Sequence, residues 1–225
     1  MNSSYLGILI TIFSYLVGKY LSKKFKNPIF NPLLVGIVLS ILIMVIFDIN
    51  YDEYKVGGDY ISFFIAPATV ALVVPLYKNI SILRRNLIPI VIGIFVGSLT
   101  AVISVIVLAD LLNLDYNMKI TLMTQSITTA IALPMSEILG GIGAITAIAV
   151  SSRGVFGAVI APSLFKLLKI EDPVAKGVSI GTASHASGTS KAIEMGEVEG
   201  SISGLSIAIA GVFTAIIIPI FISIM

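Results

Sequence analysis

Apolar segments of membrane-spanning length follow one another along almost the whole chain of 225 residues. A helix that crosses the hydrocarbon core of a bilayer needs about 20 consecutive apolar residues. Lipid offers no hydrogen bonds, so such segments satisfy their backbone groups internally, as helices. The sequence therefore predicts an all-α polytopic membrane protein with about seven to eight membrane segments, some broken or re-entrant. We expect one transmembrane domain over residues 1–225. The apolar runs cover residues 5–21, 31–47, 60–77, 87–108, 119–136, 142–168 and 201–225.

Composition excludes several other classes of protein. Charged residues make up 12% of the chain, whereas soluble domains carry about 25%. A soluble enzyme is therefore not expected, and the sequence has no recognisable hydrolase or ATP-binding motif. The absence of cysteine and the presence of a single histidine argue against a metal centre, and no cofactor is expected. A net charge of +2 is too small to indicate nucleic-acid binding.

Charges between the apolar runs indicate which loops face the cytoplasm, because lysine and arginine are enriched in cytoplasmic loops. A lysine cluster follows the first run, so we expect a multi-pass protein of the cell membrane with its N-terminus outside. The acidic stretch 48–59 is expected to form an outside loop. Two simple crossings between 119 and 168 would put Lys166, Lys169 and Lys176 outside, against the rule. We therefore expect one segment in 119–168 to be re-entrant or broken into two half-helices. The first cluster consists of Lys19, Lys23, Lys24 and Lys26.

Two segments of the chain resemble each other. Thr69-Val-Ala-Leu-Val-Val-Pro75-Leu aligns with Thr128-Thr-Ala-Ile-Ala-Leu-Pro134-Met, and the Thr, Ala and Pro positions match. Internal repeats with helix breakers at matching positions are typical of secondary transporters, in which the broken helices form the binding site. We expect repeat-like segments near 60–112 and 119–168, inverted if one segment crosses an odd number of times. The alternative is that Thr, Ala and Pro simply recur in membrane helices.

The most polar stretch among the apolar runs is Gly181-Thr-Ala-Ser-His-Ala-Ser-Gly-Thr-Ser190. Irregular backbone at membrane depth is tolerated only where it is buried in protein or lines a water-filled cavity. We therefore expect a helix break that presents hydroxyl and backbone N–H groups to a small anion. His185 would donate to that anion or carry a coupled proton, because imidazole titrates near physiological pH. An exposed loop with an incidental histidine is the alternative. The candidate binding residues of this stretch are Thr182, Ser184, His185, Ser187 and Thr189.

A second polar group precedes Pro134, and an arginine lies in the middle of the run 142–168. The hydroxyls of the first group would either contact substrate or bond to carbonyls that the proline frees. An arginine within the membrane is costly unless it is paired or solvated. If Arg153 faces a cavity, it offers bidentate recognition of a carboxylate. The alternative is a short cytoplasmic turn. The candidate substrate-binding residues here are Gln125, Ser126, Thr128, Thr129 and Arg153.

Glu194 is the acidic residue nearest to the polar stretch 181–190. It is a candidate, with His185, for carrying a coupled proton, because ionisable groups near membrane segments are functional candidates. A salt bridge with Lys191 is a second interpretation. A solvated loop that also contains Glu197 and Glu199 is the third.

Four sequence blocks, in a fixed order, carry a resemblance to a known family. They are Ser126-Ile-Thr-Thr-Ala-Ile-Ala132, Gly140-Gly141-Ile142, Gly154-Val-Phe-Gly-Ala158 and Gly181-Thr-Ala-Ser-His-Ala-Ser-Gly-Thr189. With these blocks the chain resembles the LrgB/CidB family over nearly its whole length. The resemblance implies an antiholin-like or holin-like protein linked to murein hydrolase export and cell lysis. Related bacterial pairs and a plastid member look like carriers of small carboxylates such as pyruvate, glycolate or glycerate.

The same resemblance implies a small LrgA/CidA-like membrane protein as partner, within the lipid bilayer. Two departures from the family pattern bear on the site. A lysine often precedes the Ser-x-Thr-Thr block and a proline follows it, where this chain has Gln125 and Ala130. The position before Gly154 is usually uncharged, and here it is Arg153, which we expect to replace the missing positive charge. The implied site residues are Ser126, Thr128, Thr129, Thr182, Ser184, His185 and Thr189.

Two functions remain open at this point, and neither is enzymatic. The first is a secondary carrier, or carrier subunit, for a small carboxylate, with a binding site on broken helices. The alternative is a holin/antiholin-like pore or a regulator of murein hydrolase export and cell lysis. A pore needs small-residue packing faces and does not need a compact set of Ser, Thr and His side chains, so that set favours transport. The sequence leaves open whether the chain forms a homo-oligomer.

Overall fold

The computed structural model describes residues 5–25, 30–64, 67 and 77–225. Within these residues the regular secondary structure is helical and no strand occurs. The chain divides into two compact units, Met1–Ala71 and Leu72–Met225, which we describe separately. The first copy of the sequence repeat, at 69–76, lies entirely outside the described residues, so the repeat stays a prediction.

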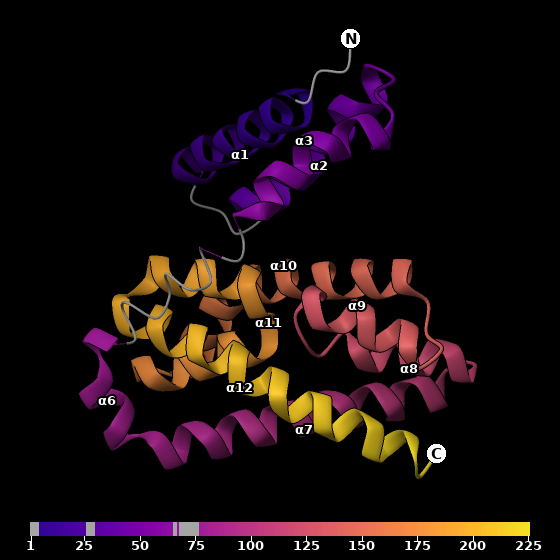
Figure 1. The fold of residues 1–225 in the computed structure, drawn as a ribbon. Helices are drawn as coiled ribbons and strands as arrows, with labels where there is room; N and C mark the ends of the chain where they lie inside the picture. Colours follow the sequence, from indigo (N-terminus) through magenta and orange to yellow (C-terminus); the bar gives the residue numbers. More distant parts are fainter. Residues whose placement is uncertain (1–4, 26–29, 65–66, 68–76) are drawn as a thin grey trace. The chain divides into compact units, whose positions relative to one another are not determined.

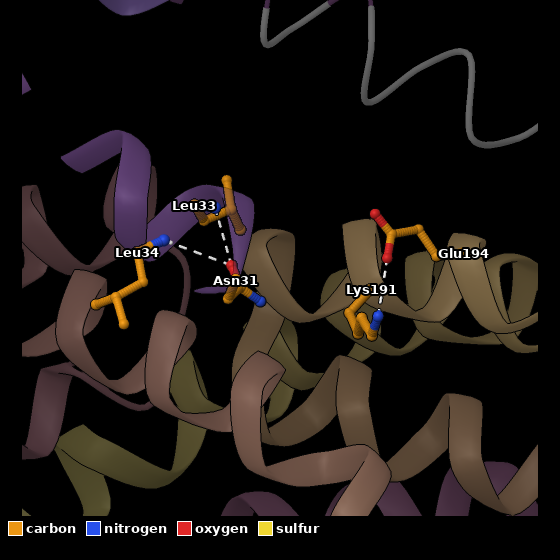
Figure 2. A network of polar contacts seen from close by, with 5 residues as sticks. All are labelled: Asn31, Leu33, Leu34, Lys191 and Glu194. Carbon is orange, nitrogen blue, oxygen red and sulfur yellow. Dashed lines mark hydrogen bonds and ion pairs between the residues drawn. The ribbon is translucent and has the colours of Figure 1, made fainter. Parts of the chain in front are cut away.

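The described part of unit 1 contains three helices, and the second of them begins where the sequence places a cap. The side chain of Asn31 accepts hydrogen bonds from the backbone nitrogens of Leu33 at 2.8 Å and Leu34 at 3.4 Å (Figure 2). Pro32 follows at the first helical position, where its missing N–H has no intrahelical partner to lose. The Asn-Pro pair therefore determines the start of this helix. The helices are α1 (Tyr5–Phe25), α2 (Pro32–Ile46) and α3 (Tyr51–Phe63).

The acidic stretch 48–59, expected as a loop, is mostly helical, and this expectation was wrong. Helix α3 starts after Asn50, whose side chain accepts from the backbone nitrogen of Asp52 at 3.2 Å. Acidic residues in the first turn interact favourably with the positive end of the helix dipole. Lys55 and Asp59 form an ion pair at 3.2 Å across one turn. Negative charge at this position therefore favours a helix as well as an outside loop.

Helices α1 and α3 touch through two glycines. A Cβ atom added to Gly57 would lie 2.7 Å from the Cα of Gly7, which is closer than real side chains approach. The hydroxyls of Thr11 and Tyr54 are 2.8 Å apart beside this contact and hold the same two helices together. Small residues let helix backbones approach closely, and the resulting packing contributes to helix association in lipid.

We expect Gly57→Ala to lower the free energy of unfolding by about 1–3 kcal/mol, because the added methyl overpacks a backbone contact. Gly58→Ala is the matched control, since its Cβ would meet only the Tyr54 ring at 3.8 Å. The control should be neutral or slightly stabilising, because alanine is a better helix former than glycine. Thermal unfolding of both variants in detergent makes the comparison. Equal effects of the two substitutions would contradict the glycine contact.

Unit 2 contains the remaining described helices and is organised around α11. Helix α11 packs most extensively on α12 and also contacts α7 and α10 (Figure 1). One core cluster joins Ile90 and Ile94 of α7 to Ile202 and Ala210 of α12. The helices are α6 (Ile80–Arg85), α7 (Leu87–Leu111), α8 (Tyr116–Thr124), α9 (Thr129–Ile138), α10 (Gly143–Leu167), α11 (Pro173–Met195) and α12 (Glu197–Ile222).

Among the described residues, four helices are long and apolar enough to cross a membrane: α1, α7, α10 and α12. Helix α2 is a shorter apolar helix. Each of these five coincides with an apolar run of the sequence. The run 119–136 is instead divided into α8 and α9, as expected for a broken helix, whereas 142–168 forms the single helix α10. The chain is therefore a helical membrane protein, and the total of seven to eight segments remains a prediction.

Candidate functional site

Two interruptions of helical geometry in the described part of unit 2 involve predicted site residues. Between α8 and α9 the chain leaves the helix over residues 125–128, and Thr128 has the extended backbone of a helix N-cap. Within α11 the interruption is confined to His185, which has φ 48° and ψ −132°. A positive φ is rare for any residue with a side chain and costs about 1–3 kcal/mol unless the surroundings enforce it. The helix break expected over 181–190 is thus narrower than the polar stretch itself.

The two breaks meet through hydrogen bonds. The Nε2 atom of His185 lies 2.8 Å from the carbonyl oxygen of Ser126, and Nη1 of Arg153 donates to the carbonyl oxygen of Gln125 at 3.1 Å. A carbonyl oxygen only accepts, so Nε2 of His185 carries a proton in this arrangement. A helix end leaves its last carbonyls without intrahelical partners, and such groups are costly to leave unpaired at membrane depth. Arg153 and His185, from other helices, therefore provide the hydrogen bonds that the carbonyls at the end of α8 lack within the helix.

Glycines on α10 make room for the break in α11. A Cβ atom on Gly157 would overlap the side chain of Ser184, and one on Gly154 would lie 3.0 Å from the hydroxyl of Ser187. The backbone of α10 therefore lies directly against the residues on both sides of His185, which is itself only 3% exposed. This packing explains the Gly154-Val-Phe-Gly spacing, because the two glycines are three residues apart and lie on the same side of the helix.

Only some of the predicted site residues take part in the hydrogen bonds around the two breaks. Gln125, Ser126, Arg153 and His185 are joined by hydrogen bonds. It is the backbone of Gln125 and Ser126, and not their side chains, that takes part. The hydroxyl of Ser126 is buried and, among the described residues, has no hydrogen-bond partner. Thr128 and Thr129 are half-buried at the start of α9, where Thr128 makes no side-chain cap.

Two predicted residues have other partners. Thr189 is buried and its hydroxyl is 2.7 Å from that of Ser203 on α12, so it joins these two helices. Glu194 is exposed and forms an ion pair with Lys191 at 2.9 Å (Figure 2). An exposed pair of this kind contributes about 0–1 kcal/mol. The salt bridge proposed from the sequence is therefore present.

Sequence reasoning missed a second polar network around the same broken helix. The hydroxyl of Thr146 on α10 donates to that of Ser136 on α9 at 2.7 Å. The backbone nitrogen of Ile142 donates to the hydroxyl of Thr121 on α8 at 2.8 Å. These bonds hold the two half-helices against α10. The sequence shows single Ser and Thr residues within apolar runs. This pattern does not indicate which of them form hydrogen bonds with one another.

The arrangement is suited to binding a small anion. Arg153 is half-buried and uses one of its N–H groups on Gln125. Guanidinium carries further donors in a planar fork, and this fork matches a carboxylate. Within the described residues no carboxylate forms an ion pair with Arg153. The chemistry of this side chain therefore allows it to bind an anion.

The sequence of the chain matches one family model, described as "LrgB-like family", over residues 11–224. The chain belongs to the LrgB-like family. Curated members of similar sequence are named "Antiholin-like protein LrgB". Those of Bacillus cereus (strain B4264) and Bacillus cereus (strain AH187) are each 39% identical over 218 residues. The antiholin-like protein LrgB of Bacillus anthracis (strain A0248) has the same identity. In each case the alignment covers 96% of this chain and 95% of the relative.

No solved structure matches this LrgB-like chain significantly. The family assignment, expected from the sequence blocks, is therefore confirmed by sequence similarity over almost the full length. It agrees with the apolar helices in identifying a membrane protein.

Proposed function

We propose that this LrgB-like protein is a secondary carrier, or the subunit of a carrier, for small carboxylates such as pyruvate, glycolate or glycerate. The observation that supports the proposal is the meeting of two helix breaks beside a half-buried arginine that no described carboxylate neutralises. Broken helices that meet within the membrane are typical of the binding sites of secondary transporters. The carboxylate of the substrate would occupy the remaining donors of Arg153.

His185 is the better of the two candidates for a coupled proton. It is buried at the break and bonds to Ser126 through one ring nitrogen, so uptake of a second proton would change the charge within the site. Glu194 is exposed and paired with Lys191. Its carboxylate therefore already has a partner, away from the hydrogen bonds that join the two breaks.

A second candidate function is the antiholin-like role, which the names of the relatives favour. In this alternative the chain regulates murein hydrolase export and cell lysis, together with an LrgA/CidA-like membrane partner. Assembly into homo-oligomers would then carry the activity. Comparison with relatives favours this alternative over the carrier, whereas the geometry of the two breaks favours the carrier. We propose a location in the cell membrane with the N-terminus outside for both functions.

Flux measurements distinguish the two candidates. We expect saturable uptake of labelled pyruvate, glycolate or glycerate into proteoliposomes that contain the chain, alone or with an LrgA-like protein. Entrapped carboxyfluorescein should stay inside, because a carrier opens no continuous pore. Empty liposomes are the control. Release of the dye, together with uptake that does not saturate, would contradict the carrier and support a pore. Absence of any carboxylate flux in both preparations would also contradict the carrier.

A further inference from the structure

An apolar groove of about 360 Å³ lies between α1 and α2 of unit 1, which pack side by side (Figure 1). Its lining consists of Val, Leu and Phe side chains, none of which can hydrogen-bond a polar ligand. Leu34, Val38 and Leu42 line it at spacings of four residues, along one side of α2. The groove therefore extends about 12 Å along the helix axis. Its shape and chemistry suit a hydrocarbon chain.

A helix of another protein is a poorer occupant of this groove. Helices associate closely in lipid where small residues line the contact, and the lining has none. The nearby Gly18 is already used within the pair, because a Cβ atom on it would lie 2.7 Å from the carbonyl oxygen of Pro32. The groove thus presents bulky, branched side chains. A flexible acyl chain can follow such an uneven surface, whereas a rigid helix cannot approach it closely.

A lysine lies at one end of the groove. Val17 and Leu21 of α1 line it, and Lys24 follows three residues later on the same side of the helix. The Nζ atom of Lys24 lies 5.6 Å from the centre of the Phe25 ring. That ring stacks on the ring of Phe30 with 4.7 Å between their centroids, and Phe30 lines the groove. Two aromatic rings therefore connect the positive charge to the apolar channel.

The charge of Lys24 is available to an anion. Its side chain is exposed and, in the part of the chain that the structure describes, forms no ion pair. A larger groove of about 680 Å³ lies along another side of α2, and its lining includes the acidic residue Asp48 but no lysine or arginine. Of these two grooves, the smaller one combines an apolar channel with a cation at its end. This combination is complementary to an amphiphile with a negative head.

We infer that the groove between α1 and α2 binds one acyl chain of an anionic phospholipid, with Lys24 against the phosphate of its headgroup. Basic residues at the end of a membrane helix attract anionic lipids. Here the groove adds apolar surface, so that one lipid is held at a defined place. Burial of the chain provides affinity, and the lysine provides the preference for a negative head. The inference is independent of whether the protein is a carrier or a pore.

Lipid binding to the full chain in detergent, followed by native mass spectrometry, tests the inference. Dioleoylphosphatidylglycerol is compared with dioleoylphosphatidylcholine, which has the same chains and no net charge. We expect tighter binding of the first lipid. Lys24→Gln should weaken that binding by about fivefold, because one lysine near an anionic lipid surface contributes roughly this factor. Lys23→Gln is the matched control. It removes the same charge from another side of α1, so the affinity should change little.

Filling the groove provides a second test. Val38→Trp should weaken the binding of phosphatidylglycerol, whereas Val45→Trp, in the larger groove of the same helix, should preserve it. Glycerol 1-phosphate, which lacks acyl chains, should not displace the lipid. Equal losses in Lys24→Gln and Lys23→Gln would indicate general attraction to a basic helix end and overturn the inference. Equal affinity of the wild type for both lipids would also overturn it. The lysine variants keep the test informative if Val38→Trp does not fold.

Discussion

Carboxylate uptake is expected to fall at least about 100-fold when Arg153 is replaced by Gln. Removing one partner of a buried ion pair costs about 3–5 kcal/mol, and about 1.4 kcal/mol corresponds to a factor of ten. Glutamine matches the length of the side chain only in part, and it can still donate to the carbonyl of Gln125. The substitution therefore removes the charge and the planar fork, while the end of α8 keeps a donor within reach. Initial rates of labelled pyruvate uptake into proteoliposomes measure the effect.

Two further variants test whether uptake depends on a positive charge at position 153 or on positive charge anywhere in the chain. Arg153→Lys keeps the charge but loses the fork, so it should recover part of the uptake. Lys191→Gln removes a positive charge from the exposed pair with Glu194, and uptake should stay within about twofold of the wild type, because exposed pairs contribute little. Unchanged uptake and affinity in Arg153→Gln would rule out Arg153 as the substrate anchor. It would also rule out the hypothesis that Arg153 replaces the lysine expected before Ser126.

At position 185 glycine is expected to be better tolerated than alanine, which reverses their usual order inside a helix. Glycine normally costs about 0.5–1 kcal/mol relative to alanine in a helix. His185, however, has φ 48° and ψ −132°, a conformation that glycine adopts without strain. Alanine would keep the strain of about 1–3 kcal/mol and lose the bond to Ser126 that helps to hold it. His185→Gly should therefore unfold at a higher temperature than His185→Ala in the same detergent.

Both variants should reduce pyruvate uptake by about tenfold or more. The carbonyl of Ser126 loses its partner in each, and an unpaired buried acceptor costs about 1–3 kcal/mol. Together the variants separate two roles of His185: the imidazole is lost in both, while the backbone strain is relieved only by glycine. If alanine proved the more stable replacement, the positive φ would not be a property of the folded protein. Normal uptake in either variant would exclude His185 as the proton carrier.

Much of the helical architecture could be predicted because it depends on local chemistry. The Asn31-Pro32 pair predicts the start of α2, and the hydroxyl-rich group before Pro134 marks the division between α8 and α9. The polar stretch 181–190 and the arginine inside the apolar run 142–168 identified His185 and Arg153 as candidate site residues. In each case the chemical preference of a residue acts within a few positions of it along the chain.

Features that depend on contacts between distant segments could not be predicted. Charge pattern alone did not distinguish an acidic loop from the capped helix α3, because the same residues favour both. The acceptors for Arg153 and His185 are backbone carbonyls, which every residue carries, so no sequence signal identifies them. The close contact of Gly93 and Gly97 with Val178 and Thr182 depends on how α7 lies against α11.

The exchange of hydrogen bonds between the two breaks has a mechanical consequence. The end of α8 is held by side chains from α10 and α11, and the bend of α11 is held in turn by the backbone of Ser126. A change of shape at one interruption would therefore lengthen or break the hydrogen bond that the other provides. A shift of α8 against α10 would likewise strain the bond between Arg153 and Gln125. We therefore expect the two interruptions and the half-buried arginine to move together.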